Sequence, residues 1–389
     1  MTFATGLLKN RFLSSLERIS HGRLTLTTPE GAVLRFGSAG PEADLEVRDW
    51  SFLPRLARRG DVGLGESWID RQWETASLEN VLALALKNMD HLAPWAKAGR
   101  LPGWAMRFSD RVSRMNSLGG SARNIRAHYD VGNEFYQLWL DRGMSYSSAL
   151  FAPGDDDLER AQTRKNDRIL SRLTAGETVL EIGCGWGSFA EAAAMRGRRV
   201  KAITISPSQS AYADARLDGR AEIRLQDYRH TAGRFDNIVS VEMIEAVGER
   251  YWPTYFATLK ARLADDGRAI LQAITVPDAS FPAYRKRSDF IRQHAFPGGM
   301  LPCRAAIAAQ AARAGLTLSD SFAFGQDYAR TCRLWAGRMM AERPRIFRFG
   351  YDDAFLRSWQ FYLEGCAATF ATGRTDVVQV ELTHAEGPA

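Results

Sequence analysis

The chain has 389 residues, of which 45% are hydrophobic and 11% aromatic, so it can bury a large core and is long enough for two domains. Such a composition excludes a chain that is mainly disordered. The formal net charge of +6 at pH 7 favours an anionic partner, either a nucleic acid or the phospholipid headgroups of a membrane.

The cysteines and the N-terminal residues indicate the cellular compartment of the protein. The cysteines are widely separated and lack the paired spacing of a zinc site, so we expect neither a disulfide framework nor a bound metal: Cys184, Cys303, Cys332 and Cys366. Residues 1–20 have scattered charges and no continuous apolar segment. The apolar run at 81–86 is far shorter than the ~20 residues that cross a bilayer. The sequence therefore predicts a cytoplasmic protein.

The first 110 residues are predicted to form a small α/β module. Apolar and polar residues alternate over 24–34 around Pro29-Glu30-Gly31, which predicts a hairpin, and 43–47 is typical of another short strand. Two basic stretches, 9–11 and 55–59, adjoin the apolar residues Phe12, Leu13, Phe52 and Leu53. This mixture predicts docking on an anionic lipid surface, and the alternative is an ordinary solvated basic face.

Beyond a connection at about 103–126, strands and helices alternate. The predicted strands are 178–182, 200–205, 221–225, 235–241 and 268–274. Apolar strands alternating with helices predict an α/β, doubly wound and mostly parallel sheet. Prolines interrupt this rhythm over about 276–345, which we interpret as a helical insertion covering the active site.

Residues 178–187 are the most informative segment. An apolar strand ends in Glu181 and runs into Gly183, Gly185 and Gly187, whose backbone can approach a ligand closely. A nicotinamide-binding turn would require a glycine instead of Ser188 and an acid after the next strand, and both are missing. An acid immediately before the glycines is typical of S-adenosylmethionine (SAM) methyltransferases, which this stretch resembles. The alternative is a structural turn without a ligand.

Further motifs extend the resemblance over nearly the whole chain. They lie at 65–70, 128–133, 204–209, 226–229, 239–248, 296–302 and 361–366. With these motifs the chain resembles the cyclopropane fatty acid synthases and their mycolic-acid-modifying relatives. The resemblance implies a seven-stranded SAM-methyltransferase sheet within 111–389. It also implies an enzyme that acts on the double bond of an unsaturated acyl chain in a phospholipid.

The glycine turn and the resemblance together imply a set of SAM-binding residues. They are Tyr129, Asp130, Glu181, Gly183, Gly185, Thr204, Ser206, Gln209, Gln226 and Asp227. Two alternatives stay open: Tyr129 can be an ordinary core tyrosine, and Gln226 with Asp227 can be a turn or helix-start pair.

The family also holds a bicarbonate ion that serves as the base. Its ligands correspond here to Glu245, Tyr328 and the backbone of Ile274, while Ser148 replaces a cysteine and Gln272 a histidine. Serine and glutamine can donate hydrogen bonds to an anion, but neither carries the charge of an imidazolium. These departures leave bicarbonate open. Cys366 matches the family's active-site cysteine, although a cysteine on an apolar helix face is usually a small hydrophobe.

The implied chemistry passes through a carbocation. The double bond attacks the methyl of the sulfonium, and the cation left on the neighbouring carbon is stabilised by carboxylates and aromatic faces. Loss of a proton from the new methyl closes a cyclopropane, whereas a preceding hydride shift gives a methylene branch. The sequence leaves this choice open.

Three other functions are alternatives to this one: an amine or small-molecule N-methyltransferase, a nucleic-acid methyltransferase and a non-catalytic SAM-binding or lipid-binding protein. Residues 241–244 lack the Asn/Asp-Pro-Pro-aromatic motif of exocyclic amino methylation, so no nucleic-acid partner is expected. We expect a peripheral protein on the inner face of the membrane that binds anionic headgroups and unsaturated acyl chains. Whether it forms a homodimer is left open.

Overall fold

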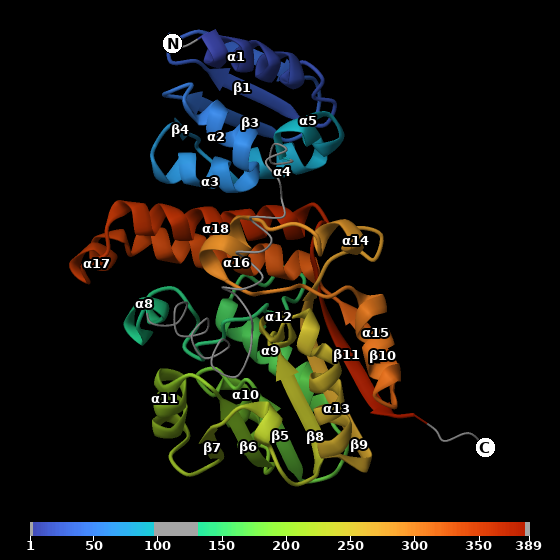
Figure 1. The fold of residues 1–389 in the computed structure, drawn as a ribbon. Helices are drawn as coiled ribbons and strands as arrows, with labels where there is room; N and C mark the ends of the chain where they lie inside the picture. The colour runs from blue at the N-terminus through green and yellow to red at the C-terminus, as the bar shows by residue number, and fades with distance from the viewer. Residues whose placement is uncertain (1–2, 97–130, 386–389) are drawn as a thin grey trace. The chain divides into compact units, whose positions relative to one another are not determined.

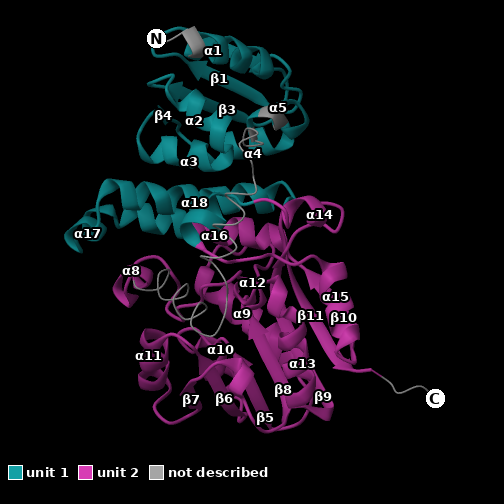
Figure 2. Cartoon of the chain, in the orientation of Figure 1, with its two compact units in different colours: residues 1–111, 288–295, 335–374 teal, residues 112–287, 296–334, 375–389 magenta. Residues whose placement is uncertain are grey.

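The computed structural model describes residues 3–96 and 131–385, and the chain divides into two compact units (Figures 1 and 2). Unit 1 comprises residues 1–111, 288–295 and 335–374. Unit 2 comprises residues 112–287, 296–334 and 375–389. The predicted boundary near residue 110 lies at the end of the first segment of unit 1. Two later segments, 288–295 and 335–374, also belong to that unit. Among the described residues, no helix is both long and apolar enough to cross a bilayer.

Unit 1 contains a four-stranded sheet in the order β2-β1-β3-β4. The predicted hairpin is confirmed, because β1 pairs antiparallel with β2 and brings Leu26 opposite Leu34. The strands are β1 (Arg23–Thr27), β2 (Val33–Gly37), β3 (Glu42–Val47) and β4 (Trp73–Glu74). The helices are α1 (Phe3–Leu16), α2 (Phe52–Arg59), α3 (Asp61–Ile69), α4 (Leu78–Lys87), α5 (Met89–Ala96), η3 (Ile291–Ala295), α17 (Arg343–Arg348) and α18 (Asp353–Ala371).

A buried arginine ties α18 to the first module. Helix α18 packs on α3 and α4, and Arg357 is only 7% exposed. Its guanidinium lies 3.7 Å from the centre of the Trp68 ring, donates to the Trp68 carbonyl at 2.8 Å and pairs with Glu74 at 3.2 Å. The Trp68 indole in turn donates to the Arg357 carbonyl. These contacts are the reason that residues far along the chain belong to unit 1.

Replacing Arg357 with alanine is expected to lower the free energy of unfolding by roughly 2–4 kcal/mol, because the partly buried Glu74 carboxylate loses its nearer partner and keeps Arg71 at 3.6 Å, and the Trp68 carbonyl loses a hydrogen bond. Denaturant unfolding measures this change. Arg345→Ala on α17 is the control, since its side chain is 55% exposed and lies 4.0 Å from Glu342. The control should change the stability by less than about 0.5 kcal/mol. Equal effects of the two substitutions would contradict the role given to Arg357.

Unit 2 is built on a seven-stranded sheet in the order β10-β11-β9-β8-β5-β6-β7, which confirms the predicted fold. Strands β5 to β9 are parallel, and β11 pairs antiparallel with both β9 and β10. The strands are β5 (Thr178–Ile182), β6 (Arg199–Thr204), β7 (Glu222–Leu225), β8 (Phe235–Val241), β9 (Leu263–Thr275), β10 (Leu316–Ala323) and β11 (Asp376–His384).

Helices cover both faces of this sheet (Figure 1). On one face, α13 (Trp252–Arg262) and α15 (Arg304–Arg313) pack on alternate strand residues such as Leu180 and Ile238. On the other face lie α9 (Leu158–Ser171), α10 (Ser188–Ala194) and α11 (Pro207–Leu217). The shorter elements are α8 (Asn133–Gln137), η1 (Tyr228–His230), α12 (Ile244–Val247), η2 (Glu249–Tyr251) and α14 (Phe281–Tyr284), and α16 (Gly325–Ala341) runs from unit 2 into unit 1.

Strands β10 and β11 did not stand out in the sequence. Strand β10 lies within 276–345, the stretch interpreted as an insertion, yet it pairs with β11 at the edge of the sheet. Only Leu316 of β10 is buried, so the strand lacks the apolar run of its parallel neighbours. This part of the predicted insertion is therefore a strand of the sheet.

Candidate active site

The glycine turn after β5 leaves an open space at the carboxyl edge of the sheet. Gly183 and Gly185 have φ values of +84° and +53°, which favour glycine. The N–H groups of Gly183 and Cys184 both donate to the Ile203 carbonyl near the end of β6. A Cβ atom added to Gly185 would meet no atom of the described residues within 4 Å. The turn thus has room for a ligand against its backbone.

The ends of β6 and β7 bring other predicted residues to the same edge. The Thr204 hydroxyl donates to Gln209 Oε1 at 3.0 Å, and the Gln226 N–H donates to the Thr204 carbonyl at 2.9 Å. Ser206 is the N-cap of α11, and its hydroxyl accepts a hydrogen bond from the Gln209 N–H. Thr204, Ser206 and Gln209 are all buried. Because β5, β6 and β7 are parallel neighbours, these residues border the glycine turn.

Gln226 and Asp227 make the local contacts of a turn. Gln226 Nε2 donates to the His230 carbonyl at 2.8 Å, and Asp227 accepts the Arg229 N–H while pairing with its guanidinium at 2.6 Å. These contacts match the alternative of a helix-start pair, and a cofactor role for both residues stays a prediction. Tyr129 and Asp130 lie outside the described residues.

A buried acid adjoins the turn. Glu181 is 2% exposed, and its Oε2 atom has no hydrogen-bond partner among the described residues. Burial raises the pKa of Glu181 to about 8, although the positive charge of Lys165 opposes the rise. Lys165 on α9 is itself buried and donates to the Ser147 hydroxyl at 3.1 Å. A buried oxygen without a partner beside an open backbone turn fits a ligand that donates hydrogen bonds.

A second acid, Glu242, follows β8 directly. It adopts a φ of +50°, which is uncommon for a residue with a side chain. Its Oε1 atom accepts hydrogen bonds from the Ser148 N–H at 2.9 Å and from Gln272 Nε2 at 2.7 Å. Its Oε2 atom accepts one from the Tyr328 hydroxyl at 2.6 Å. Three residues predicted to hold a separate anion thus surround a carboxylate of the chain itself.

Two of the predicted ligands contact these acids through their backbone N–H groups. Ser148 presents its backbone N–H to Glu242, while its hydroxyl donates to the Ala149 carbonyl at 3.0 Å. The Ile274 N–H donates to a carboxylate oxygen of Glu245. Glu242 was not among the predicted site residues, although an acid directly after a buried parallel strand could have signalled a role.

Glu245 lies on α12 next to this cluster. Its Oε2 atom has no hydrogen-bond partner among the described residues. Burial and the negative charge of Glu242 raise the pKa of Glu245 to about 8. Burial also raises the pKa of Glu242, but hydrogen bonds from Tyr328 and its neighbours, together with the charge of Lys165, oppose the rise. Burial therefore disfavours a charge on both acids at once, and the hydrogen bonds to Glu242 favour the charge on Glu242 over one on Glu245.

A line of aromatic rings connects the glycine turn with the proline-rich loop. Trp186 lies 5.1 Å from Tyr136, Tyr136 lies 5.5 Å from Tyr146, and Tyr146 lies 6.4 Å from Phe296, measured between ring centres. The loop returns to the acid pair, because the Met300 N–H donates to the Glu245 carbonyl at 2.8 Å. Aromatic faces and carboxylates thus occur in one region of unit 2.

Cys366 lies on α18 in unit 1, whereas the other residues expected to take part in catalysis belong to unit 2. It is partly buried, and its carbonyl accepts a hydrogen bond from the Thr369 hydroxyl at 2.9 Å. A chemical role for its thiol stays a prediction.

A parallel sheet with this strand order, an open glycine turn and a buried acid beside it define a SAM-dependent methyltransferase. The family model of mycolic acid cyclopropane synthetase matches residues 117–380. Tuberculostearic acid methyltransferase UfaA1 of Mycobacterium tuberculosis is 36% identical and covers 99% of this chain and 92% of its own. The cyclopropane-fatty-acyl-phospholipid synthase of Escherichia coli is 33% identical over 87% of each chain.

A solved structure agrees with these relatives. Mycolic acid cyclopropane synthase CmaA1, complexed with SAH and CTAB, superposes with a TM-score of 0.62 and 28% identity, covering 67% of this chain and 97% of that one. The chain therefore belongs to the mycolic acid cyclopropane synthetase family. It is a SAM-dependent methyltransferase that modifies lipid chains.

Proposed function

We propose that the enzyme methylates the double bond of an unsaturated acyl chain in a phospholipid, through a carbocation, to give a cyclopropane or a methylene branch, and a methyl branch would form only when a separate hydride donor reduces the methylene group. The observation that carries this proposal is the pair of acids Glu242 and Glu245, which the segments of Tyr146 and Phe296 reach through the Ser148 N–H and the Met300 N–H. The names of two relatives, a fatty-acyl-phospholipid synthase and a fatty acid methyltransferase, support the same substrate class.

The residues of the site suit this reaction. When bound, SAM supplies an electrophilic methyl group on a sulfonium. The open turn at Gly185 and the unpartnered oxygen of Glu181 would hold it at the carboxyl edge of the sheet. The aromatic faces and the carboxylate of Glu242 would attract the positive charge that develops on the acyl chain.

Radiolabelled SAM incubated with liposomes of unsaturated phospholipid tests the proposal. We expect the label in the acyl fraction, and mass spectrometry after derivatisation separates a cyclopropane from a methylene branch of equal mass. Label recovered in an added amine, with none in the acyl chains, would contradict the proposal in favour of an N-methyltransferase.

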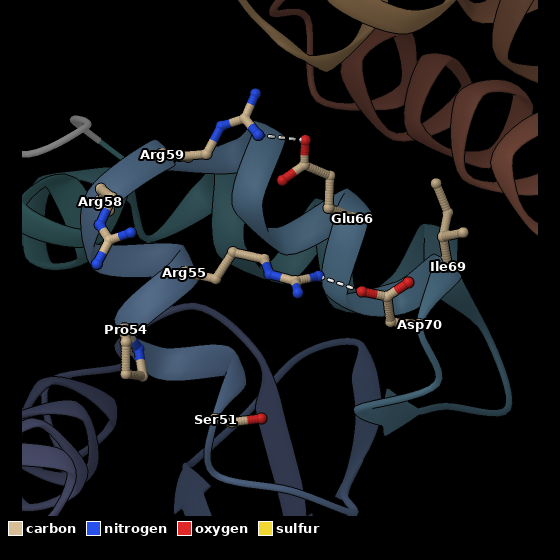
Figure 3. A pocket seen from close by; sticks show the side chains of 8 residues that line it. All are labelled: Ser51, Pro54, Arg55, Arg58, Arg59, Glu66, Ile69 and Asp70. Atoms are coloured by element: carbon tan, nitrogen blue, oxygen red, sulfur yellow. Dashed lines mark hydrogen bonds and ion pairs between the residues drawn. The ribbon is translucent and has the colours of Figure 1, made fainter.

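We also propose that unit 1 docks the enzyme on anionic headgroups. The apolar side chains of Phe12, Phe52 and Leu53 are buried in the core of unit 1, contrary to the expectation that they contribute to a membrane surface. The proposed docking therefore rests on the basic side chains of unit 1 and not on these apolar side chains. A pocket of about 560 Å³ on α2 and α3 gathers this charge (Figure 3), and it is lined by Ser51, Pro54, Arg55, Arg58, Arg59, Glu66, Ile69 and Asp70.

The three arginines of this pocket differ in how far they are neutralised. Arg55 pairs with Asp70, and Arg59 pairs with Glu66 at 2.6 Å (Figure 3). Arg58 is exposed and makes no ion pair or hydrogen bond with the part of the chain that the structure describes. An incoming phosphate would therefore meet an uncompensated cation at Arg58.

Reversing Arg55, Arg58 and Arg59 to glutamate is expected to weaken binding to phosphatidylglycerol vesicles by roughly 1 kcal/mol per charge, with Arg58 contributing most. The binding should also fall steeply with salt, because the charges are exposed. Vesicle sedimentation at several salt concentrations measures both effects.

A charge-matched control separates docking from net charge. Reversing Arg142, Arg304 and Arg313, which are exposed residues of unit 2, changes the net charge equally. This control should weaken binding far less than the α2 variant. Equal loss in the two variants, or equal binding of the natural protein to neutral and anionic vesicles, would argue that the α2 charges are merely a solvated face.

A further inference from the structure

We infer that the carboxylate of Glu242 is the base of the reaction, built into the chain at the place where a free bicarbonate ion was expected. The inference rests on the proposed methylation of a double bond, because that chemistry requires a group that accepts a proton from the acyl chain. It goes beyond that proposal by naming the acceptor and by removing the need for an external anion.

The Glu242 carboxylate accepts hydrogen bonds from donors that an external anion would need. A carboxylate, like bicarbonate, is a planar anion that accepts hydrogen bonds at its oxygens. Ser148 N–H, Gln272 Nε2 and Tyr328 OH all donate to Glu242, and the fourth expected donor, Ile274 N–H, is used by Glu245. Each donor expected to bind an external anion already binds a carboxylate of the chain.

The cluster is also held in place from outside. Gln272 is 1% exposed, and its Oε1 atom accepts a hydrogen bond from Gln379 Nε2 at 2.9 Å, which fixes the amide so that its Nε2 donates to Glu242. The Glu242 N–H donates to the Gln272 carbonyl at 2.7 Å. This bond holds Glu242 in its left-handed conformation, and a non-glycine residue kept in such a conformation often serves function.

The geometry also selects the oxygen that receives the proton. Glu242 Oε1 accepts two hydrogen bonds, which occupy both of its lone pairs, whereas Oε2 accepts one from the described residues, that of Tyr328. The free lone pair is therefore on Oε2. Among the described residues, the Glu245 carboxylate accepts hydrogen bonds from backbone N–H groups and none from a side chain, so its charge is less stabilised than that of Glu242.

The step balances without a further reactant. The π electrons of the double bond form the new bond to the methyl carbon, the electrons of the carbon–sulfur bond leave with sulfur, and one chain carbon becomes positive. Glu242 Oε2 then takes a proton from that methyl. The released C–H electron pair closes the three-membered ring, or forms a methylene double bond if a hydride has first moved along the chain. The neutral Glu242 afterwards loses its proton to solvent.

Two substitutions at Glu242 test the assignment by activity. Glu242→Gln keeps the shape but cannot take the proton, so turnover should fall by roughly 100-fold or more, with SAM affinity within about threefold. Glu242→Gly suits the positive φ and leaves Ser148, Gln272 and Tyr328 facing an empty anion site. Added bicarbonate should restore part of its activity, but not that of Glu242→Gln. Glu177→Gln, at a 73% exposed side chain, should behave like the natural protein.

Binding of ¹³C-labelled bicarbonate, followed by nuclear magnetic resonance, gives a second readout that does not depend on turnover. We expect no binding to the natural protein or to Glu242→Gln, and binding to Glu242→Gly. If no methyl group is transferred to any acyl chain, the proposed function is wrong. The binding experiment would still show whether Glu242 occupies the place of a bicarbonate ion.

Three results would overturn the inference: bicarbonate binding to the natural protein, loss of its activity by tenfold or more in bicarbonate-free buffer, or near-natural turnover of Glu242→Gln. If Glu242→Gly does not fold, as judged by circular dichroism, the measurements on the natural protein and on Glu242→Gln remain decisive.

Discussion

Replacing Gly185 with valine should raise the dissociation constant for SAM by about 100-fold or more while the chain still folds. A Cβ atom at this position meets no atom of residues 3–96 or 131–385 within 4 Å, so the new side chain enters the open space beside the turn, which is the space assigned to the cofactor. The φ of +53° adds backbone strain of roughly 1–2 kcal/mol. Calorimetric titration measures the affinity, and circular dichroism checks the fold.

Gly197→Val is the matched control for this strain. Gly197 has a φ of +77° and nothing within 4 Å of an added Cβ, but it precedes β6 at the amino edge of the sheet. The Gly197→Val protein should lose about as much stability as the Gly185→Val protein, but it should keep its affinity for SAM. A folded Gly185→Val protein with unchanged affinity would remove the structural basis for placing SAM at this turn.

The stability of the natural protein should fall, relative to that of Glu245→Gln, as the pH rises from about 5 to 8. The pKa of Glu245 is raised from 4.5 to about 8 by burial and by Glu242. Between these values the folded state keeps a proton that the unfolded state has lost, so linkage makes folding less favourable as the pH rises. The difference between the two proteins should change by about 2 kcal/mol or more over this range.

Denaturant unfolding of both proteins at pH 5 and pH 8 measures this difference. Glu177→Gln, which removes a carboxylate whose side chain is 73% exposed, is again the control variant. Parallel stability curves for the natural protein and Glu245→Gln would show that Glu245 titrates as an ordinary carboxyl and that the acid pair does not share one charge.

Local sequence patterns were enough to predict the fold of the central sheet. Strands such as 178–182 and 235–241 are short apolar runs between helical segments, and burial on both faces of a parallel sheet demands such runs. The glycine turn and Glu181 were also predictable, because adjacent residues determine whether a backbone can approach a ligand. By contrast, β10 is a half-exposed edge strand, and its pairing with β11 depends on residues about 60 positions away.

The environment of the acids was decided only by the tertiary structure. Glu242 meets Ser148, Gln272 and Tyr328 across 94, 30 and 86 positions of the chain, so no local pattern could show that its carboxylate lies among them. The sequence motifs indicated these hydrogen-bond donors but not the acceptor that they bind. Whether a polar residue presents its side chain or its backbone, as at Ser148, depends on how the chain turns there. The sequence by itself thus determined the sheet, the cofactor turn and the donor residues, whereas long-range packing decided which carboxylate they bind.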